Sequence, residues 1–502
     1  MNVRIAGRPL ALATLGLLCS KSLLAGHDLE EVQVTGRSAQ DQFDVTRNPS
    51  PEVDAAALLR KLPGANLNGN GPVSGIPQYR GMYGSRVAVR IDGAQFASGG
   101  PNLMDPPLHY APGMMLDSLT VYRGAAPVSA AQESIGGLVI ASTRRGEFHD
   151  QAGWAVNGTL AGTGQTVNDG LAGHALLAVA SEQHKFHLSG LAEQANDAKF
   201  GDGVIRPSEY ERKRLDVGYA LNIDHHSFEF SAARNETNDA GTAALPMDIA
   251  YIDTDLYRAR YRFDNRRWAL EASVNANDVE HLMSNFHLRP PPTDLSRWRD
   301  NLATAESLGY RVMAEFFGDQ VTWRVGTDAS GETHDSDIGN PNNEAFFVTN
   351  FNDARRRIIG AFGEAEFEVG QQWELLAGLR YNQVTMDADE VGSSMPDGSP
   401  PDRLAARFNA ADRHSVDNNI DWLVRANWMP AGSWRYTAAV SRKTRSAAYQ
   451  EKFLWLPLQA TGGLADGRNY VGDLDLKPET AHEIELGADW EGARASLTPR
   501  LY

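Results

Sequence analysis

The feature of this chain that most constrains its fold is a series of runs, about ten residues each, in which apolar and polar residues alternate. Residues 268–277 are one such run, and others begin near Phe228 and Trp373. Successive side chains of a β-strand point to opposite faces, so each run predicts a strand with one apolar and one polar face. Strands that span an outer membrane have this pattern, and so do the strands of a soluble β-sandwich.

The connections between the runs distinguish these two folds. Short turns at residues 223–226, 264–267 and 430–433 trade places with long polar segments, which lie near residues 196–210, 236–252, 280–303, 332–355, 384–417 and 444–480. One end with short turns and one with long loops is the plan of an outer-membrane barrel, whereas a compact soluble domain rarely carries so many long loops. We therefore predict an antiparallel transmembrane β-barrel over residues 149–502.

Composition agrees with a barrel. The mean hydropathy of −0.39 is too polar for a helical membrane protein, whereas in a barrel only alternate residues face lipid. Arg4 and Arg8 precede an apolar stretch, and Ala25 offers a small residue for cleavage, so residues 1–25 are predicted to be a secretory signal peptide. Loss of Arg4, Arg8 and Lys21 with it takes the formal net charge from −17 to −20, which argues against a nucleic-acid partner. The single cysteine, Cys19, lies in this segment, so any soft-metal site must use methionine and histidine.

Two blocks near the N-terminus carry a more specific signal. Residues 79–93 read Y-R-G-M-Y-G-S-R-V-A-V-R-I-D-G, and residues 117–141 contain V-Y-R-G followed by E-S-I-G-G-L-V-I. The pair resembles the plug domain of TonB-dependent outer-membrane receptors. The resemblance implies an N-terminal α+β plug domain over residues 37–148, inside the barrel, and energy-dependent uptake across the cell outer membrane. Residues 55–64 are predicted to form a short helix that Pro63-Gly64 ends.

The same resemblance extends to both ends of the chain. Residues 26–36 form a polar leader that includes Glu30, Glu31, Val32, Gln33, Val34, Thr35 and Gly36, a segment similar to the TonB box. A short β-prone segment suits strand addition to a partner sheet, here that of the TonB energy-transducing complex. Near the C-terminus, residues 476–487 resemble a block that the family places well before its last strand. Roughly 14–16 candidate strands follow residue 150, against about 22 in outer-membrane transporters, so we expect the barrel to be truncated at Tyr502.

Catalytic motifs are missing from the sequence. It contains no G-x-x-x-x-G-K-[ST], no H-E-x-x-H and no G-x-S-x-G between a strand and a helix. The acidic residues Asp387, Asp389 and Glu390 fall in a long polar loop, which favours a solvated rim over a catalytic pair. We expect a protein that is not an enzyme and has no organic cofactor.

Two distant segments suggest a metal site. Residues 99–107 read G-G-P-N-L-M-D-P-P, and residues 281–283 read H-L-M. If the even positions of residues 268–276 face lipid, then His281 and Met283 face the lumen together. Imidazole and thioether donors suit copper, and Cu(I) in particular.

Both segments resemble TonB-dependent copper receptors, in which a plug loop with M-D-P-P faces H-x-M on the barrel wall. The resemblance implies a copper ion, as the transported ligand, held by Met104, His281 and Met283. The family places a cysteine where this chain has Gly100, so the set is one ligand short. His109 or His287 could complete it, and a cysteine introduced at Gly100 is expected to strengthen it.

Two other functions stay open at this stage. Aromatic residues in the predicted loops would serve a ferric siderophore or another bulky ligand: Phe346, Phe347, Phe351, Trp455 and Tyr470. A passive surface-binding barrel is the other alternative, and a working TonB box argues against it. In all three cases the outer surface of the barrel contacts outer-membrane lipid.

Overall fold

The structure is a computed structural model that describes residues 40–45, 52–122, 125–430, 432–459, 466–492 and 494–502. The predicted signal peptide and the TonB-box segment Glu30–Gly36 lie outside these residues. No helix in this part of the chain is long and apolar enough to cross a membrane.

The N-terminal part is built on a small mixed sheet. Its strands are β1 (Gln40–Asp44), β6 (Leu116–Tyr122), β7 (Leu138–Thr143) and β5 (Ala88–Ile91), in that order, with β5 parallel to β7 and the other pairs antiparallel. A second sheet contains β2 (Ala65–Gly69), β3 (Gly75–Tyr79) and β4 (Met82–Tyr83). Four short 3-10 helices complete this part: η1 (Ala55–Lys61), η2 (Gly84–Arg86), η3 (Pro107–Tyr110) and η4 (Gly113–Met115).

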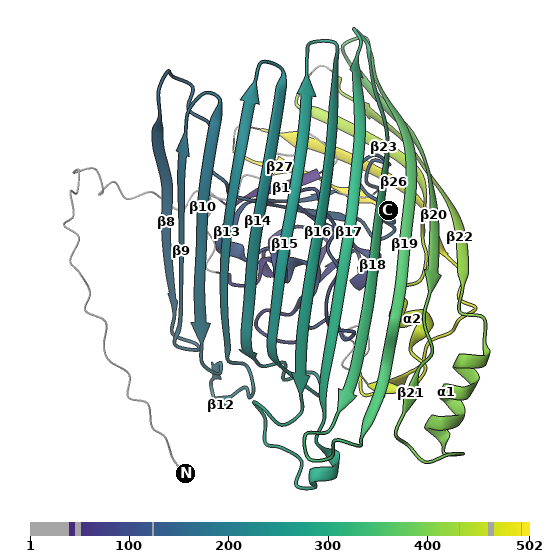
Figure 1. The fold of residues 1–502 in the computed structure, drawn as a ribbon. Helices are drawn as coiled ribbons and strands as arrows, with labels where there is room; N and C mark the ends of the chain where they lie inside the picture. Colours follow the sequence, from purple (N-terminus) through teal and green to yellow (C-terminus); the bar gives the residue numbers. More distant parts are fainter. Residues whose placement is uncertain (1–39, 46–51, 123–124, 431, 460–465, 493) are drawn as a thin grey trace, which may run out of the picture. The chain divides into compact units, whose positions relative to one another are not determined.

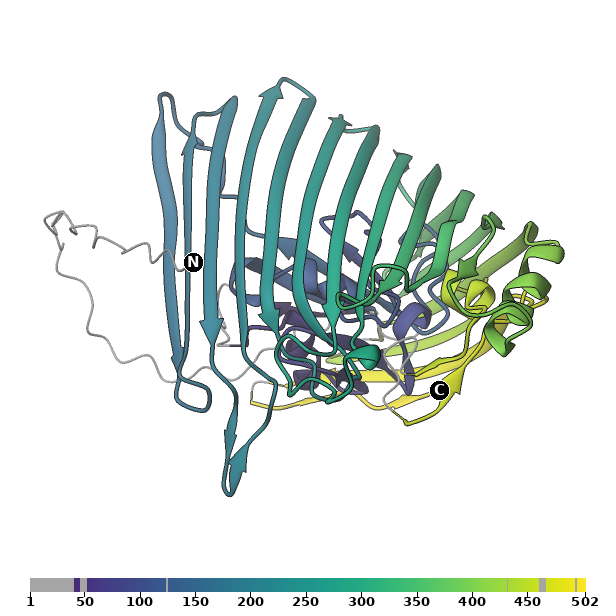
Figure 2. The ribbon, with the colours of Figure 1, turned by 60° about the horizontal axis from the view of Figure 1, so that its bottom comes forward.

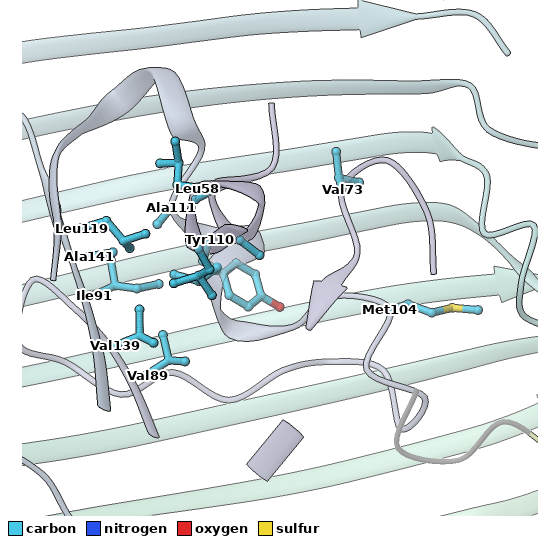
Figure 3. Close-up of a cluster of buried hydrophobic side chains, with 14 of the residues drawn as sticks. Leu58, Val73, Val89, Ile91, Met104, Tyr110, Ala111, Leu119, Val139 and Ala141 are labelled. Carbon is cyan, nitrogen blue, oxygen red and sulfur yellow. The ribbon is translucent and has the colours of Figure 1, made fainter. Parts of the chain in front are cut away.

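The predicted helix near residue 55 is present as η1, a 3-10 helix that is followed by Pro63-Gly64. Its N-cap residue Asp54 accepts hydrogen bonds from the amides of Ala56 (2.9 Å) and Gly75 (2.7 Å), which fastens η1 to β3. Strand alternation turns one face of the mixed sheet inward, where Val89, Ile91, Leu119, Val139 and Ala141 pack with Leu58 of η1 (Figure 3). This is the core of the plug domain.

The rest of the chain forms the barrel wall, one antiparallel sheet of 17 strands. The strands are β8 (Ala155–Gln165), β9 (Gly170–Ala180), β10 (His184–Ala195), β13 (Tyr210–Ile223), β14 (His226–Ala240), β15 (Asp248–Asp264), β16 (Trp268–Ser284), β17 (Asp300–Phe317), β18 (Val321–Gly339), β19 (Phe347–Val369), β20 (Trp373–Asp387), β21 (Gly392–Ser393), β22 (Ser415–Trp428), β23 (Trp434–Arg445), β26 (Glu479–Glu491), β27 (Ser496–Leu497) and β28 (Arg500–Leu501). Loops carry two hairpins and three short helices: β11 (Lys199–Phe200) with β12 (Gly203–Val204), β24 (Leu458–Gln459) with β25 (Asn469–Tyr470), η5 (Leu295–Arg297), α1 (Pro400–Ala410) and α2 (Tyr449–Phe453).

The wall curves around the plug domain, which lies on its concave side (Figures 1 and 2). Large apolar side chains are exposed on the opposite face, and tryptophans gather where strands meet the short turns: Trp268, Trp373, Trp428 and Trp434 are each exposed by 36–43%. An aromatic girdle at the ends of apolar strands is how a barrel meets the membrane–water interface. The predicted fold, an α+β plug domain inside an antiparallel β-barrel, is confirmed.

The short turns lie where the alternation predicts, but the long loops are shorter than expected. Strand β16 continues to Ser284, β19 already begins at Phe347, and β14 and β15 leave only residues 241–247 between them. Strands of 15–23 residues exceed the roughly 9–11 that cross a membrane, so their outer ends stand above it. Those ends do not alternate regularly between apolar and polar residues, so their sequence resembles that of a loop.

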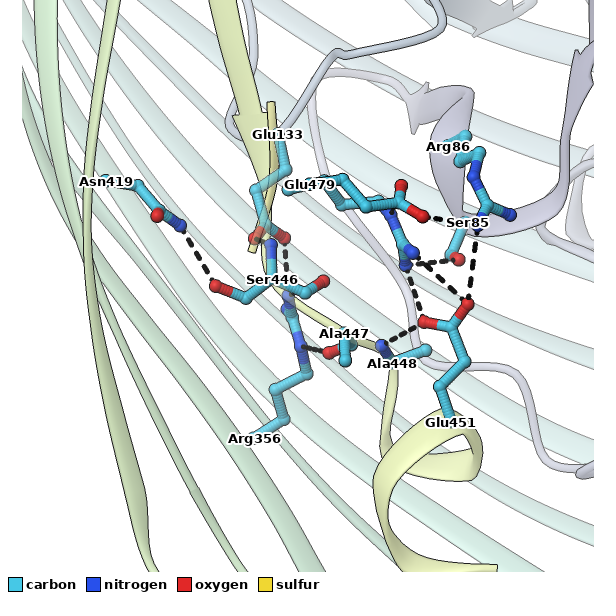
Figure 4. A network of polar contacts seen from close by, with 11 residues as sticks. Ser85, Arg86, Glu133, Arg356, Asn419, Ser446, Ala447, Ala448, Glu451 and Glu479 are labelled. Atoms are coloured by element: carbon cyan, nitrogen blue, oxygen red, sulfur yellow. Dashed lines mark hydrogen bonds and ion pairs between the residues drawn. The ribbon is translucent and has the colours of Figure 1, made fainter. Parts of the chain in front are cut away.

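Charged pairs tie the plug domain to the wall near the C-terminal strands. Arg80 forms an ion pair with Glu485 of β26 at 2.9 Å, and Arg86 forms one with Glu479. Arg445 of β23, whose side chain is 3% exposed, donates to Ser85 at 2.9 Å and also to Glu479 at 3.0 Å. Figure 4 shows the part of this network around Ser85, Arg86 and Glu479. The sequence blocks at 79–86 and 476–487 therefore meet in space.

Candidate metal site

Strand β16 supplies a row of lumen-facing side chains that bind the plug. The amide nitrogen of Asn275 donates to the carbonyl of Gln95 at 3.2 Å. Asn277 both accepts from the Ala97 amide (3.3 Å) and donates to the Ala97 carbonyl (3.1 Å). On the other face of the strand Val274 is 49% exposed. The predicted register is therefore present, with odd-numbered residues toward the plug.

Further along β16 the plug backbone comes close enough to require glycine. A Cβ at Gly99 would lie 2.7 Å from Cγ1 of Val279, and a Cβ at Gly100 would lie 2.8 Å from both Cε1 and Nδ1 of His281. Such contacts are shorter than van der Waals distances, so a side chain at either glycine would displace its neighbour. The absence of Cβ atoms is what lets this loop rest on the strand.

Asp105 fastens the loop in this position. Its Oδ2 accepts from the Gly99 amide (2.6 Å) and the Tyr110 hydroxyl (2.5 Å), and its Oδ1 accepts from the Gly100 amide (2.9 Å). Burial alone would raise the pKa of the Asp105 carboxyl, but the interactions with His281 and Tyr110 lower it to about 2. A fully buried carboxylate with this many donors stays ionised and holds the loop rigidly.

The same carboxylate orients His281. Nδ1 of His281 donates to Oδ1 of Asp105 at 3.2 Å, across the boundary between barrel and plug. Asp105 can only accept, so in the neutral imidazole this bond places the ring proton on Nδ1 and leaves the lone pair on Nε2. Nε2 is fully buried and has no hydrogen-bond partner among the described residues. A buried imidazole with a free, correctly protonated nitrogen is ready to bind a metal ion.

Met104 belongs to the plug and Met283 belongs to β16. Both are 0% exposed and belong to one buried apolar cluster. Figure 3 shows Met104 at the edge of that cluster, on its own loop, away from Leu58 and Val89. The loop turns at Leu103, whose φ of 50° is uncommon for residues other than glycine. Met104 and Met283 therefore lie in one buried cluster of plug and barrel residues, and their joint role with His281 as metal ligands stays a prediction.

Neither histidine suggested as a further ligand is available. His109 donates or accepts through both ring nitrogens, with the Val73 carbonyl at 3.0 Å and the Thr237 hydroxyl at 3.1 Å. Burial and nearby Arg212 lower the pKa of His109 to about 4, so the ring is neutral. His287 is exposed, and its Nε2 lies 2.5 Å from Asp239. A side chain introduced at Gly100 would also find no free space, because the His281 ring occupies it.

Sequence reasoning missed the residues that position the site. Asp105 belongs to the G-G-P-N-L-M-D-P-P motif of residues 99–107. Its role in orienting His281 depends on the folding of this loop back on itself, which the sequence does not show. Asn275 and Asn277 were identified only as polar residues of an alternating run. No three or more His, Cys, Asp and Glu side chains cluster to hold a metal in the described part of the chain.

Comparison with known proteins places these features in a family. The model for the TonB-dependent receptor plug domain matches residues 37–138, and the model for the TonB-dependent receptor-like β-barrel matches residues 194–502. No curated protein matches the sequence.

Solved structures show the same fold at low identity. The copper transporter OprC is 22% identical with a TM-score of 0.79, and the match covers 95% of this chain and 72% of that one. The ferric yersiniabactin uptake receptor FyuA from Yersinia pestis is 14% identical with a TM-score of 0.66, covering 92% and 71%. The FrpB iron transporter from Neisseria meningitidis (F3-3 variant) is 15% identical with a TM-score of 0.64, covering 90% and 69%.

TonB-dependent receptors are transporters and receptors of the outer membrane, a class distinct from enzymes. Because the barrel model alone matches more than half of the residues, this chain belongs to the TonB-dependent receptor family.

Proposed function

We propose that the protein imports copper ions, using Met104, His281 and Met283 to bind Cu(I) between plug and barrel. The observation that carries the proposal is Nε2 of His281, which is fully buried and has no partner in the described part of the chain, while Nδ1 is bonded to Asp105. Two thioethers and one neutral imidazole form a soft donor set, which favours Cu(I) over harder cations. The protein acts as a carrier, not as an enzyme.

The division of ligands between two domains suggests how the ion is released. Met104 belongs to the plug, whereas His281 and Met283 belong to β16. Movement of the plug away from β16 removes one of three metal bonds and also breaks the Asp105–His281 hydrogen bond. The force would come from the TonB complex through the segment Glu30–Gly36, so that binding is tight at rest and weak when the plug is pulled.

A ferric siderophore is the weaker alternative. The loop aromatics that would contact such a ligand pack instead against one another: Phe351 is 2% exposed and Trp455 is 3% exposed, with the Trp455 indole donating to the Thr349 carbonyl at 3.0 Å. Phe347, at 48%, is the exposed member of the set. A passive surface-binding barrel would differ in needing no energy coupling, so deletion of Glu30–Gly36 would leave its function intact.

Direct binding tests the proposal. Full-length protein purified in detergent is titrated with Cu(I) under reducing conditions, in competition with a chromophoric Cu(I) chelator. We expect one tightly bound Cu(I) per chain and no tight binding of a ferric catecholate or hydroxamate complex. Tight binding of a ferric complex, together with no Cu(I) binding, would reject copper import and favour uptake of a ferric siderophore.

Asp105→Asn is expected to weaken Cu(I) binding by about 10–100-fold, the usual loss when a group that orients a metal-binding histidine is removed. The amide keeps the size of the carboxylate but can present Nδ2 to His281, which disfavours the tautomer with a free Nε2. The chelator competition measures the change. Tyr110→Phe is the control, because it removes one hydrogen bond to Asp105 without touching His281, and it should bind Cu(I) nearly as well as the natural chain.

Gly100→Cys and Gly100→Ala form a second matched pair. Both add a Cβ that must displace the His281 ring, so Gly100→Ala is expected to bind Cu(I) more weakly than the natural chain. The thiolate of Gly100→Cys is a strong soft donor beside the site and should recover affinity relative to Gly100→Ala. Equal Cu(I) affinities for the two variants, with equal thermal stability, would show that residue 100 does not face the metal.

A further inference from the structure

A second histidine on the barrel wall has neither ring nitrogen satisfied. His334 of β18 is 3% exposed, and both Nδ1 and Nε2 have no hydrogen-bond partner among the described residues. Its ring stacks on Tyr449, with centroids 3.9 Å apart and planes at 15°. Stacking fixes the plane of the ring but satisfies no nitrogen. Buried polar atoms without partners are rare in folded proteins and call for an explanation.

His334 lines a cavity of about 150 Å³ between plug and barrel. Ser98, Leu103 and Pro106 contribute to the opposite wall, and all three belong to the plug loop that carries Met104. One side of this loop, with Gly99, Gly100 and Asp105, packs against β16 near His281. The other side, with Ser98, Leu103 and Pro106, lines the cavity that contains His334. The cavity is large enough for a hydrated ion or several waters.

Strand register places His334 deeper in the wall than His281. On β17, Ala303 pairs with His281 and Ala305 pairs with His334. His334 is therefore two strands from β16, about 10 Å across the sheet, and two residues nearer the short turns. Small buried side chains, Ala303 and Ala305, separate the two histidines along the wall.

One carboxylate beside the cavity lies outside the closest ion pairs. Arg356 is bound by Glu133 at 2.6 Å, and Arg445 by Glu451 at 2.8 Å, as Figure 4 shows for Arg356. Glu332 makes no contact as close as these among the described residues: its Oε2 lies 3.7 Å from Nε2 of His334, which is too long for a hydrogen bond, and Arg356 is near enough to interact with it electrostatically. Glu332 and His334 therefore present one carboxylate and one imidazole to the same cavity.

We propose that His334 and Glu332 form a second, weaker cation site, selective for a borderline divalent ion such as Cu(II). Imidazole with carboxylate is the donor pair that such ions accept, whereas two thioethers and an imidazole favour Cu(I). Two protein ligands with water completing the shell give modest affinity. Because this donor pair favours Cu(II) and the proposed cargo is Cu(I), the capacity of His334 and Glu332 to bind a cation does not rest on the proposed function.

The test separates the Met104–His281–Met283 site from the His334–Glu332 site, because the first prefers soft monovalent ions and the second prefers divalent ions. Full-length protein in detergent is first saturated with Ag(I), which occupies soft thioether sites and gives no paramagnetic signal, and is then titrated with Cu(II). We expect electron paramagnetic resonance to show one bound Cu(II) per chain with hyperfine coupling to one imidazole nitrogen. His334→Ala should abolish this signal, and Glu332→Gln should weaken binding.

Controls keep the outcome interpretable. His174→Ala removes another buried barrel histidine, one whose Nε2 already bonds the Ser189 hydroxyl at 2.9 Å, and should leave the signal unchanged. His334→Gln keeps the bulk of the ring if His334→Ala does not fold. A Cu(II) signal that persists in a folded His334 variant, or no signal in the natural chain, would overturn the inference. Cu(II) bound at His334 in a chain that binds neither Ag(I) nor Cu(I) would reject the proposed function and leave the second site standing.

Discussion

His281→Ala is expected to lower the affinity for Cu(I) by more than about 100-fold, beyond the usual cost of losing an outer-shell partner of a metal ligand. The substitution removes the one nitrogen donor and also leaves Asp105 without its partner across the plug–barrel boundary. Met283→Ala and Met104→Ala each remove a thioether and should have losses of the same order. Chelator competition under reducing conditions measures all three.

Leu282→Ala is the matched control for these variants. Leu282 lies between two proposed ligands, but strand alternation turns it to the opposite face of β16, so its Cu(I) affinity should stay close to that of the natural chain. Met104→Ala is the most informative variant, because Met104 is far from β16 in sequence and reaches it only through the fold of the plug. Similar affinities for all four variants, in proteins that melt at the same temperature, would reject copper at this site.

Deletion of Glu30–Gly36 is expected to abolish copper uptake by cells and to leave Cu(I) binding to the purified protein unchanged. The segment is proposed to pair as a strand with the TonB complex, and the candidate ligands lie elsewhere in the chain. Cellular copper measured by mass spectrometry after a short exposure reports uptake, and the chelator competition reports binding.

A matched control for the deletion replaces the seven residues by a Gly/Ser segment of equal length, which keeps the spacing but lacks the β-prone side chains. This variant should also fail to take up copper. Surface levels of all variants must be equal. Full uptake after either change would indicate a passive barrel, because an energised receptor cannot open its plug without the coupling segment.

The barrel could be predicted from sequence because its signal is local. Alternation in residues 268–277 reports the two faces of one strand, and Asp264–Arg267 reports the turn before it, so both were found without a structure. The same logic failed for the outer strand ends. In β19, residues 347–355 read F-V-T-N-F-N-D-A-R, which does not alternate between apolar and polar residues, and the pairing with β18 shifts register here. Their pattern therefore does not distinguish a strand from a loop.

The sequence by itself determined the strands, the register that turns His281 and Met283 to the lumen, and the resemblance that identifies Met104. Only the tertiary structure decided that Asp105 orients His281, that the His281 ring fills the space at Gly100, and that His109 is already satisfied. The physical reason is distance along the chain. A strand pattern depends on residues two apart, whereas the Asp105–His281 bond joins residues 176 apart and exists only when the plug is seated in the barrel. His334 and Glu332 became a candidate site for the same reason, since a free nitrogen can be recognised only when all of its neighbours are in place.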